Sequence, residues 1–103
     1  MYLINSDSGM SLYYVYILET IAKNNRKRFY TGYTNNLYRR LEEHKKGTGA
    51  KFCRGKKSIT LKYIETFSER NLAMRREIEI KTFTRKQKFQ LIRTFNEDDL
   101  VEQ

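Results

Sequence analysis

Residues 29–44 of the chain read FYTGYTNNLYRRLEEH. The first part alternates aromatic and β-branched residues as a strand does, with Gly32 in its interior. Two asparagines follow, and then a segment that favours a helix and carries the only histidine of the chain, His44. A strand that passes directly into such a helix predicts that polar side chains from both elements gather at one place.

The rest of the chain predicts a small domain of mixed secondary structure. Segments rich in β-branched and aromatic residues predict strands at residues 13–19, 28–34 and 60–67. Segments with apolar residues at helical spacing predict helices at about 36–46, 69–83 and 85–95. The order β-β-α-β-α-α predicts an α/β (α+β) fold, in which helices flank a three-stranded sheet.

Capping residues indicate where the helices begin and end. Asn35 or Asn36 can cap the first helix, which Gly47 is expected to end. Ser68 and Thr84 are the expected N-caps of the second and third helices. We expect one domain at residues 13–95, a disordered lead at 1–12 and an acidic tail at 96–103.

The charge of the chain indicates its partners. The 103 residues carry a formal net charge of +9, and residues 1–96 hold all 21 basic residues but only eight of the 12 acidic ones. A basic body of this kind attracts polyanions, nucleic acid first, although it is also compatible with a merely soluble basic protein. We expect no membrane span and no secretory signal, and the single cysteine, Cys53, favours a reducing, cytoplasmic setting.

Strand alternation places two tyrosines together. Tyr16 lies on one face of the first strand, and Tyr30 and Gly32 lie on one face of the second. If these faces coincide, two phenols lie side by side next to a glycine, which often marks a close approach. Ordinary aromatic packing would explain either tyrosine alone.

The helices add three further candidates. Arg40 and His44 are one turn apart on the edge of the apolar stripe of the first helix, so both are expected at its rim, neither fully buried nor fully exposed. Together with the tyrosines, they could hold a phosphate. In the second helix, Glu77 lies at the margin of a stripe that also contains Arg76, which periodicity does not explain. Glu77 is either an ion-pair partner of Lys81 or a metal ligand, and one carboxylate with substrate phosphates suits Mg²⁺.

The stretch from residue 45 to 58 is a basic loop in this prediction. Six cations are expected to contact a nucleic-acid backbone, namely Lys45, Lys46, Lys51, Arg54, Lys56 and Lys57. Phe52 could stack on an unpaired base, but packing into the core is the interpretation that we favour. Cys53 is expected to be structural, because no second cysteine or nearby base accompanies it.

Several short segments together resemble the GIY-YIG nuclease domain. They read YVY at 14–16, YTG at 30–32, GYTNNLYRRLEEH at 32–44, GTGAKF at 47–52 and AMRREIEIK at 73–81. Gly32 and Asn35 belong to this pattern, which is most similar to the small stand-alone, uncharacterised (UPF0213-like) members. Two departures stand out: Tyr14 replaces a glycine, and KQKFQ at 86–90 lacks the asparagine of larger nucleases.

The resemblance implies hydrolysis of DNA phosphodiesters with one divalent metal, Mg²⁺ or Mn²⁺. It implies that Tyr16 and Tyr30 are partners of the attacking water and that Arg40 stabilises the charge on phosphorus. It further implies that His44 assists proton transfer and that Glu77 binds the metal. We expect an endonuclease of low sequence specificity, acting on nicked, branched or damaged DNA. The alternative is a nucleic-acid-binding module without hydrolysis, and a structural adaptor with a basic face is a third interpretation.

Overall fold

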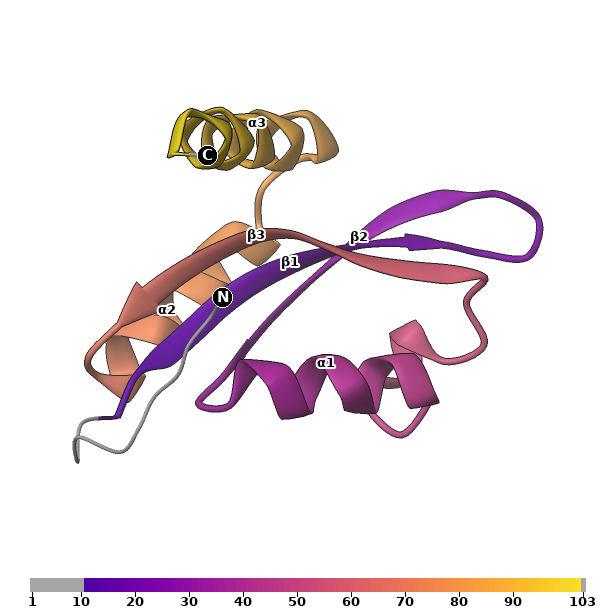
Figure 1. Cartoon of the computed structure of the whole chain (residues 1–103), viewed down its shortest axis with the longest axis horizontal. Coiled ribbons are helices and arrows are strands. Elements are labelled where there is room, and N and C mark those ends of the chain that lie inside the picture. Colours follow the sequence, from indigo (N-terminus) through magenta and orange to yellow (C-terminus); the bar gives the residue numbers. More distant parts are fainter. Residues whose placement is uncertain (1–10, 103) are drawn as a thin grey trace.

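The structure, a computed structural model, describes the backbone of residues 11–102 and the side chains of residues 11–95. The strands are β1 (Tyr13–Ile21), β2 (Lys27–Thr34) and β3 (Ser58–Phe67). The helices are α1 (Leu37–Lys46), the short 3₁₀ helix η1 (Lys51–Cys53), α2 (Arg70–Lys81) and α3 (Arg85–Glu102). The predicted fold, with element order β-β-α-β-α-α, is confirmed (Figure 1). The lead predicted at 1–12 lies mostly outside the described residues.

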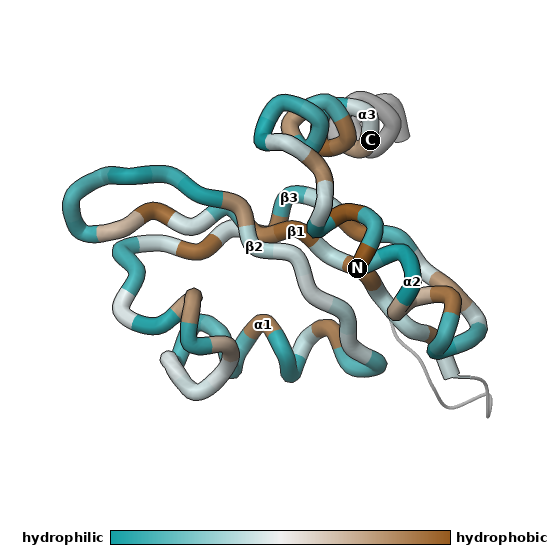
Figure 2. Tube along the Cα trace, turned by 180° about the vertical axis from the view of Figure 1, so that it is seen from behind, coloured by the Kyte–Doolittle hydropathy of each residue, from teal (hydrophilic) through white to brown (hydrophobic). Residues whose placement is uncertain are grey.

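The sheet is antiparallel and has the order β2-β1-β3, so β1 is paired on both sides. Helix α1 covers one face of the sheet, and α2 and α3 lie on the other (Figure 1). Val15 and Ile17 of β1 belong to an apolar cluster with α2 and α3, whereas Tyr16 and Leu18 belong to a second cluster with α1. This burial on both faces explains why β1 reads as a continuous run of apolar residues, while the hairpin between β1 and β2 is hydrophilic (Figure 2).

Helix α1 has the limits that its capping residues predict. The side chain of Asn36 accepts a hydrogen bond from the backbone N–H of Arg39 at 3.1 Å, so Asn36 is the N-cap and Asn35 is an exposed neighbour. Gly47 ends the helix in the left-handed region, at φ 85°. Only Asn35 and Asn36 separate β2 from α1, so this short connection determines how α1 lies against the sheet.

The caps of the other two helices differ from each other. Thr84 and Gln87 cap α3 reciprocally, because each side chain accepts a hydrogen bond from the backbone N–H of the other residue. The prediction for Ser68 is wrong: the N-cap position of α2 is Glu69, and it makes no side-chain cap bond. Helix α3 continues to Glu102, past the end expected at about 95, since no glycine or proline interrupts residues 96–102.

The packed face of α2 contains charged residues that the apolar pattern did not place. Ala73 and Ile80 are fully buried, whereas Leu72 is exposed. Arg76 occupies the position between them because its guanidinium pairs with Glu65 of β3 at 2.8 Å and with Glu79 at 2.9 Å. Within the described part of the chain, no helix has the length and apolarity needed to cross a membrane.

Candidate active site

The two tyrosines lie on the same face of the sheet, as strand alternation predicts. Tyr16 is paired with Gly32, and Leu18 is paired with Tyr30, so all four residues face α1. The ring centroids of Tyr16 and Tyr30 are 6.5 Å apart, with the planes inclined by 44°. The phenols are therefore neighbours on adjacent strands.

Gly32 makes room for the phenol of Tyr16. A Cβ atom at position 32 would lie 2.5 Å from the Tyr16 hydroxyl oxygen and 2.7 Å from Cζ. Tyr16 is only 1% exposed and cannot move aside without disturbing the cluster around it. The glycine inside β2 is thus required by the close approach of Tyr16 rather than by its backbone conformation.

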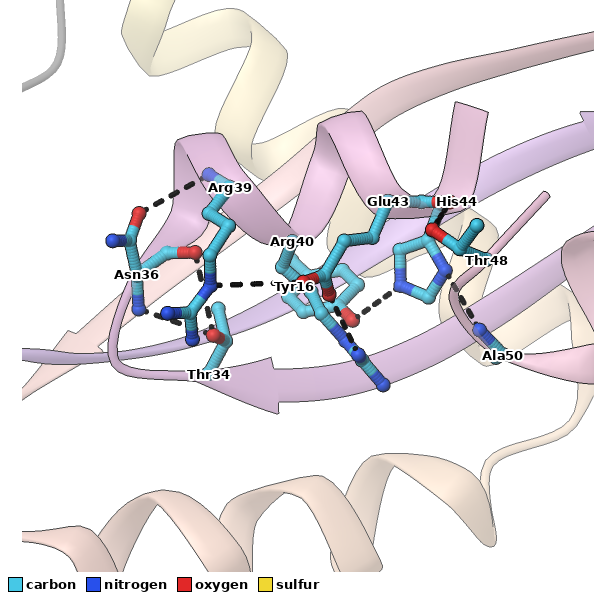
Figure 3. Close-up of polar contacts among 9 residues, drawn as sticks. All are labelled: Tyr16, Thr34, Asn36, Arg39, Arg40, Glu43, His44, Thr48 and Ala50. Carbon is cyan, nitrogen blue, oxygen red and sulfur yellow. Dashed lines mark hydrogen bonds and ion pairs between the residues drawn. The ribbon is translucent and has the colours of Figure 1, made fainter. Parts of the chain in front are cut away.

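His44 is buried, contrary to the rim position expected from the helical wheel. It is 1% exposed, because the turn after α1 folds back over its ring. The backbone N–H of Ala50 donates to His44 Nδ1 at 3.2 Å, and Nε2 lies 2.8 Å from the Tyr16 hydroxyl oxygen (Figure 3). A Cβ at Gly49 would lie 2.5 Å from Nδ1, so this turn also depends on a glycine.

These two contacts fix the protonation of the imidazole. Nδ1 accepts a hydrogen bond from a backbone N–H, so in the neutral ring the proton must be on Nε2. Nε2–H then donates to the hydroxyl oxygen of Tyr16. The pKa of His44 is lowered, first by burial and then by the charge of Arg40, which keeps the ring neutral near pH 7.

Arg40 lies at the rim of the site, as expected. Its side chain is 36% exposed and is held by Glu43, whose Oε1 lies 3.0 Å from Nη1. The positive charge of the guanidinium also acts on the Tyr16 hydroxyl. Arg39 is exposed, and its Nε lies 3.7 Å from the other oxygen of Glu43. Glu43 thus contacts both arginines, as the i,i+3 and i,i+4 spacings permit.

The hydroxyl groups of both tyrosines resist ionisation in the free protein. Burial raises the pKa of Tyr16 well above its usual range, although the nearby guanidinium of Arg40 acts in the opposite direction. Burial also raises the pKa of Tyr30, and the charge of Lys81 partly offsets this. Either phenol therefore needs additional positive charge before it can lose a proton near neutral pH.

Glu77 lies on α2, in the layer opposite α1. Its side chain is 16% exposed, and its Oε2 lies 3.2 Å from Nζ of Lys81, the ion pair expected in one of the two interpretations. Its charge acts on Tyr30, which lies on the edge strand β2. Among the described residues, no three histidine, cysteine, aspartate or glutamate side chains form a metal-binding cluster.

The basic loop after α1 lies beside the tyrosines. Phe52 is half-buried and stacks on Tyr30, with the ring centroids 5.7 Å apart and the planes inclined by 20°. Nζ of Lys56 lies 4.8 Å from the Phe52 centroid, and Nζ of Lys57 donates to Asn25 at 2.6 Å. Lys51 and Arg54 of the loop are exposed, and so are Lys45 and Lys46, which the structure places in the last turn of α1 rather than in the loop.

Cys53 follows Phe52 and is buried, 1% exposed, in the cluster beneath α1. Burial raises the pKa of its thiol, although Lys56 and Arg40 act in the opposite direction. A buried thiol with a raised pKa is a poor nucleophile, in agreement with the structural role expected for it.

Comparison with known proteins agrees with this geometry. Residues 12–90 match the GIY-YIG catalytic domain, and the chain therefore belongs to this family of nuclease domains. A relative from Staphylococcus haemolyticus, UPF0213 protein SH2523, is 46% identical over 83 residues, which cover 81% of this chain and 96% of the relative. UPF0213 protein HQ_3675A from Haloquadratum walsbyi is 44% identical over 79 residues, covering 77% and 84% respectively.

A solved structure is also similar. The solution NMR structure of UPF0213 protein BH0048 from Bacillus halodurans is 38% identical, with a TM-score of 0.49, and the match covers 81% of this chain and 84% of that one.

Proposed function

We propose that this protein is an endonuclease that hydrolyses DNA phosphodiester bonds with the help of a divalent metal. The observation that carries the proposal is the hydrogen bond from His44 to the buried Tyr16 hydroxyl, next to Tyr30 and within the electrostatic influence of Arg40. A donor on a phenol oxygen and a nearby cation stabilise negative charge there. Packing alone would not require this arrangement, whereas proton transfer by the phenol does.

The His44 donor also constrains the direction in which the proton of Tyr16 points. Because the Tyr16 oxygen accepts a hydrogen bond from His44, its own O–H is directed elsewhere and can donate to a substrate or a water molecule. In this proposal Tyr16 and Tyr30 orient the attacking water, and one of them accepts its proton. Arg40, half-exposed at the rim, donates to the phosphate and stabilises the charge that develops on it.

His44 acts in this scheme as a positioning residue. Its Nδ1 lone pair is occupied by the N–H of Ala50, so the neutral ring has no free acceptor for a proton from Tyr16. We therefore propose that His44 assists proton transfer by holding and stabilising the Tyr16 oxygen, rather than by taking the proton itself.

Glu77 fits the role of a single-carboxylate metal ligand. Mg²⁺ keeps several waters and is commonly bound by one or two carboxylates together with substrate phosphates, and Mn²⁺ can take the same oxygen ligands. Glu77 is little exposed and close enough to act on Tyr30, but it must first leave Lys81. The ion would supply positive charge that neutralises the phosphate and favours ionisation of a nearby phenol.

The substrate in this proposal is DNA that is nicked, branched or damaged. The exposed cations of the basic loop provide phosphate contacts, which position a duplex without reading its sequence. Low sequence specificity follows in this proposal, because phosphate contacts carry no sequence information directly.

Replacement of Glu77 by Gln tests the proposal. The change keeps the size of the side chain and removes its charge, so we expect unchanged DNA binding in EDTA and a loss of Mg²⁺-dependent nicking of about a hundredfold or more. Nicking is measured on a panel of duplex, flap and branched DNAs. The matched control is Glu79→Gln, which also breaks an ion pair of α2 but faces solvent. Equal nicking by the parent and Glu77→Gln would exclude Glu77 as the ligand.

A non-catalytic nucleic-acid-binding module is the second candidate. The ion pair between Glu77 and Lys81 favours it, because a carboxylate that is already paired has less need of a metal. In that case the parent protein should bind the DNA panel but cut none of its members with Mg²⁺ or Mn²⁺.

A further inference from the structure

A second site lies beside the tyrosines, at the end of the sheet where β2 begins. It is a pocket of about 250 Å³ where the start of β2, η1 and the start of α3 meet. Its lining consists of three aromatic and three cationic residues: Phe29, Phe52, Phe83, Arg28, Arg85 and Lys88. No carboxylate belongs to this lining, so its positive charges are not balanced locally.

The cations of this pocket are held in place by aromatic rings rather than by acids. Cζ of Arg85 lies 5.2 Å from the centroid of Phe29, and Cζ of Arg28 lies 6.0 Å from that of Phe52. A guanidinium that stacks on a ring keeps most of its N–H groups free at its edges. Nη1 of Arg85 also donates to the backbone carbonyl of Lys27 at 3.1 Å, and the remaining donors of the pocket have no anionic partner among its lining residues.

The environment of Lys88 also favours the binding of an anion in this pocket. It is only partly exposed, and its pKa is lowered by burial and then by the charge of Lys81. A half-buried ammonium group beside a second cation is unfavourable unless an anion is present at some stage of function. The uncompensated positive charge of the three cations in so small a volume is matched better by a terminal phosphate, which is a dianion, than by an internal phosphodiester with its single charge.

From these observations we propose that the pocket binds the terminal phosphate of a DNA strand, with the attached nucleotide against Phe52. Phe52 lines the pocket and also stacks on Tyr30, so the pocket and the candidate active site share one wall. A strand end held here lies beside the tyrosines, which directs cleavage to DNA that already has a nick or an end. This inference rests on the proposed function only for its link to cleavage; binding of the phosphate does not depend on it.

Binding in EDTA tests the site separately from catalysis. Fluorescence anisotropy would compare nicked duplexes that differ only in a phosphate or a hydroxyl at the nick, on either the 5′ or the 3′ side. We expect the parent to prefer one phosphorylated nick about tenfold, the ratio that one charge-assisted hydrogen bond supplies. Glu77→Gln should keep this preference even if it abolishes nicking, so failure of the two proposals can be told apart.

The variant Arg28→Gln/Lys88→Gln should lose the preference while it still binds the hydroxyl-ended duplex. Its control, Lys62→Gln/Arg75→Gln, removes the same charge from residues outside the pocket and should keep the preference. If the first variant does not fold, as judged by circular dichroism, Arg85→Gln takes its place. Equal binding of both duplexes by the parent, or a preference retained by the pocket variant, would overturn the proposal. Binding of free thymidine monophosphate as tight as that of the nicked end would overturn the assignment to a strand end.

Discussion

Substitution of Gly32 by Ala tests the close approach on which the site depends. The new methyl group would lie 2.5 Å from the hydroxyl oxygen of Tyr16, and the nearest ring atom is 2.7 Å away. Tyr16 cannot rotate into free space, because it is packed on all sides and its oxygen is bonded to His44. The strain must therefore be relieved by moving β2, or by breaking the hydrogen bond between Tyr16 and His44.

The expected cost combines two terms. Overpacking of a buried site costs about 1–3 kcal/mol. Loss of the hydrogen bond leaves a buried donor of His44 unpaired, which costs about 1–3 kcal/mol more. We expect the free energy of unfolding to fall by about 2–6 kcal/mol, a large share of the roughly 5–15 kcal/mol that a domain of this kind has.

Urea unfolding, followed by circular dichroism, measures this loss, and Gly55→Ala is the control. A Cβ at Gly55 meets nothing within 4 Å, and its φ of 69° alone should make alanine cost about 1 kcal/mol. In a Tyr16→Phe background the Gly32→Ala change should cost less, because the nearest contact is gone. A Gly32→Ala protein as stable as Gly55→Ala would refute the argument that Tyr16 dictates the glycine.

Two further predictions concern the buried side chains of His44 and Cys53. Because the pKa of His44 is lowered in the folded state, the unfolded chain binds more protons as the pH falls below about 6.5, so stability should decrease by up to about 1.4 kcal/mol per pH unit there. A urea series from pH 7.5 to 5.5 checks this, and His44→Gln should flatten the profile. The thiol of Cys53 should react with a disulfide reagent only after unfolding, and Cys53→Ser should retain the activity of the parent at a cost of about 1 kcal/mol. Rapid modification of the folded protein, or a strong loss of activity, would contradict the structural role of Cys53.

Periodicity in the sequence was sufficient to predict the sheet and the two tyrosines of the candidate site. Tyr16 and Tyr30 follow from alternation along two paired strands, and the order of elements follows from the apolar pattern and the capping residues. Strand alternation, helical spacing and capping all depend on residues that are close together in the sequence, so a periodic pattern reveals them.

Contacts between distant segments could not be predicted in this way. His44 was expected at a rim, but the turn through Gly49 and Ala50 covers it, and a helical wheel contains no information on a turn that folds back. Arg76 was unexplained because its partner, Glu65, lies on a strand. The phosphate pocket was missed for the same reason, since its cations come from β2 and α3, far apart in the sequence.

The hydrogen bond between Tyr16 and His44 joins residues 28 positions apart and spans the boundary between the sheet and the layer formed by α1. Among the described residues, only β1 contributes fully buried side chains to both apolar clusters, so a sub-global opening of α1 would leave the cluster under α2 and α3 intact. Such a state would be folded but inactive, because His44 would no longer donate to the Tyr16 oxygen. The active fraction of molecules would then be set by the local stability of one ten-residue helix and its trailing turn, and it would decline on warming before the domain as a whole unfolds.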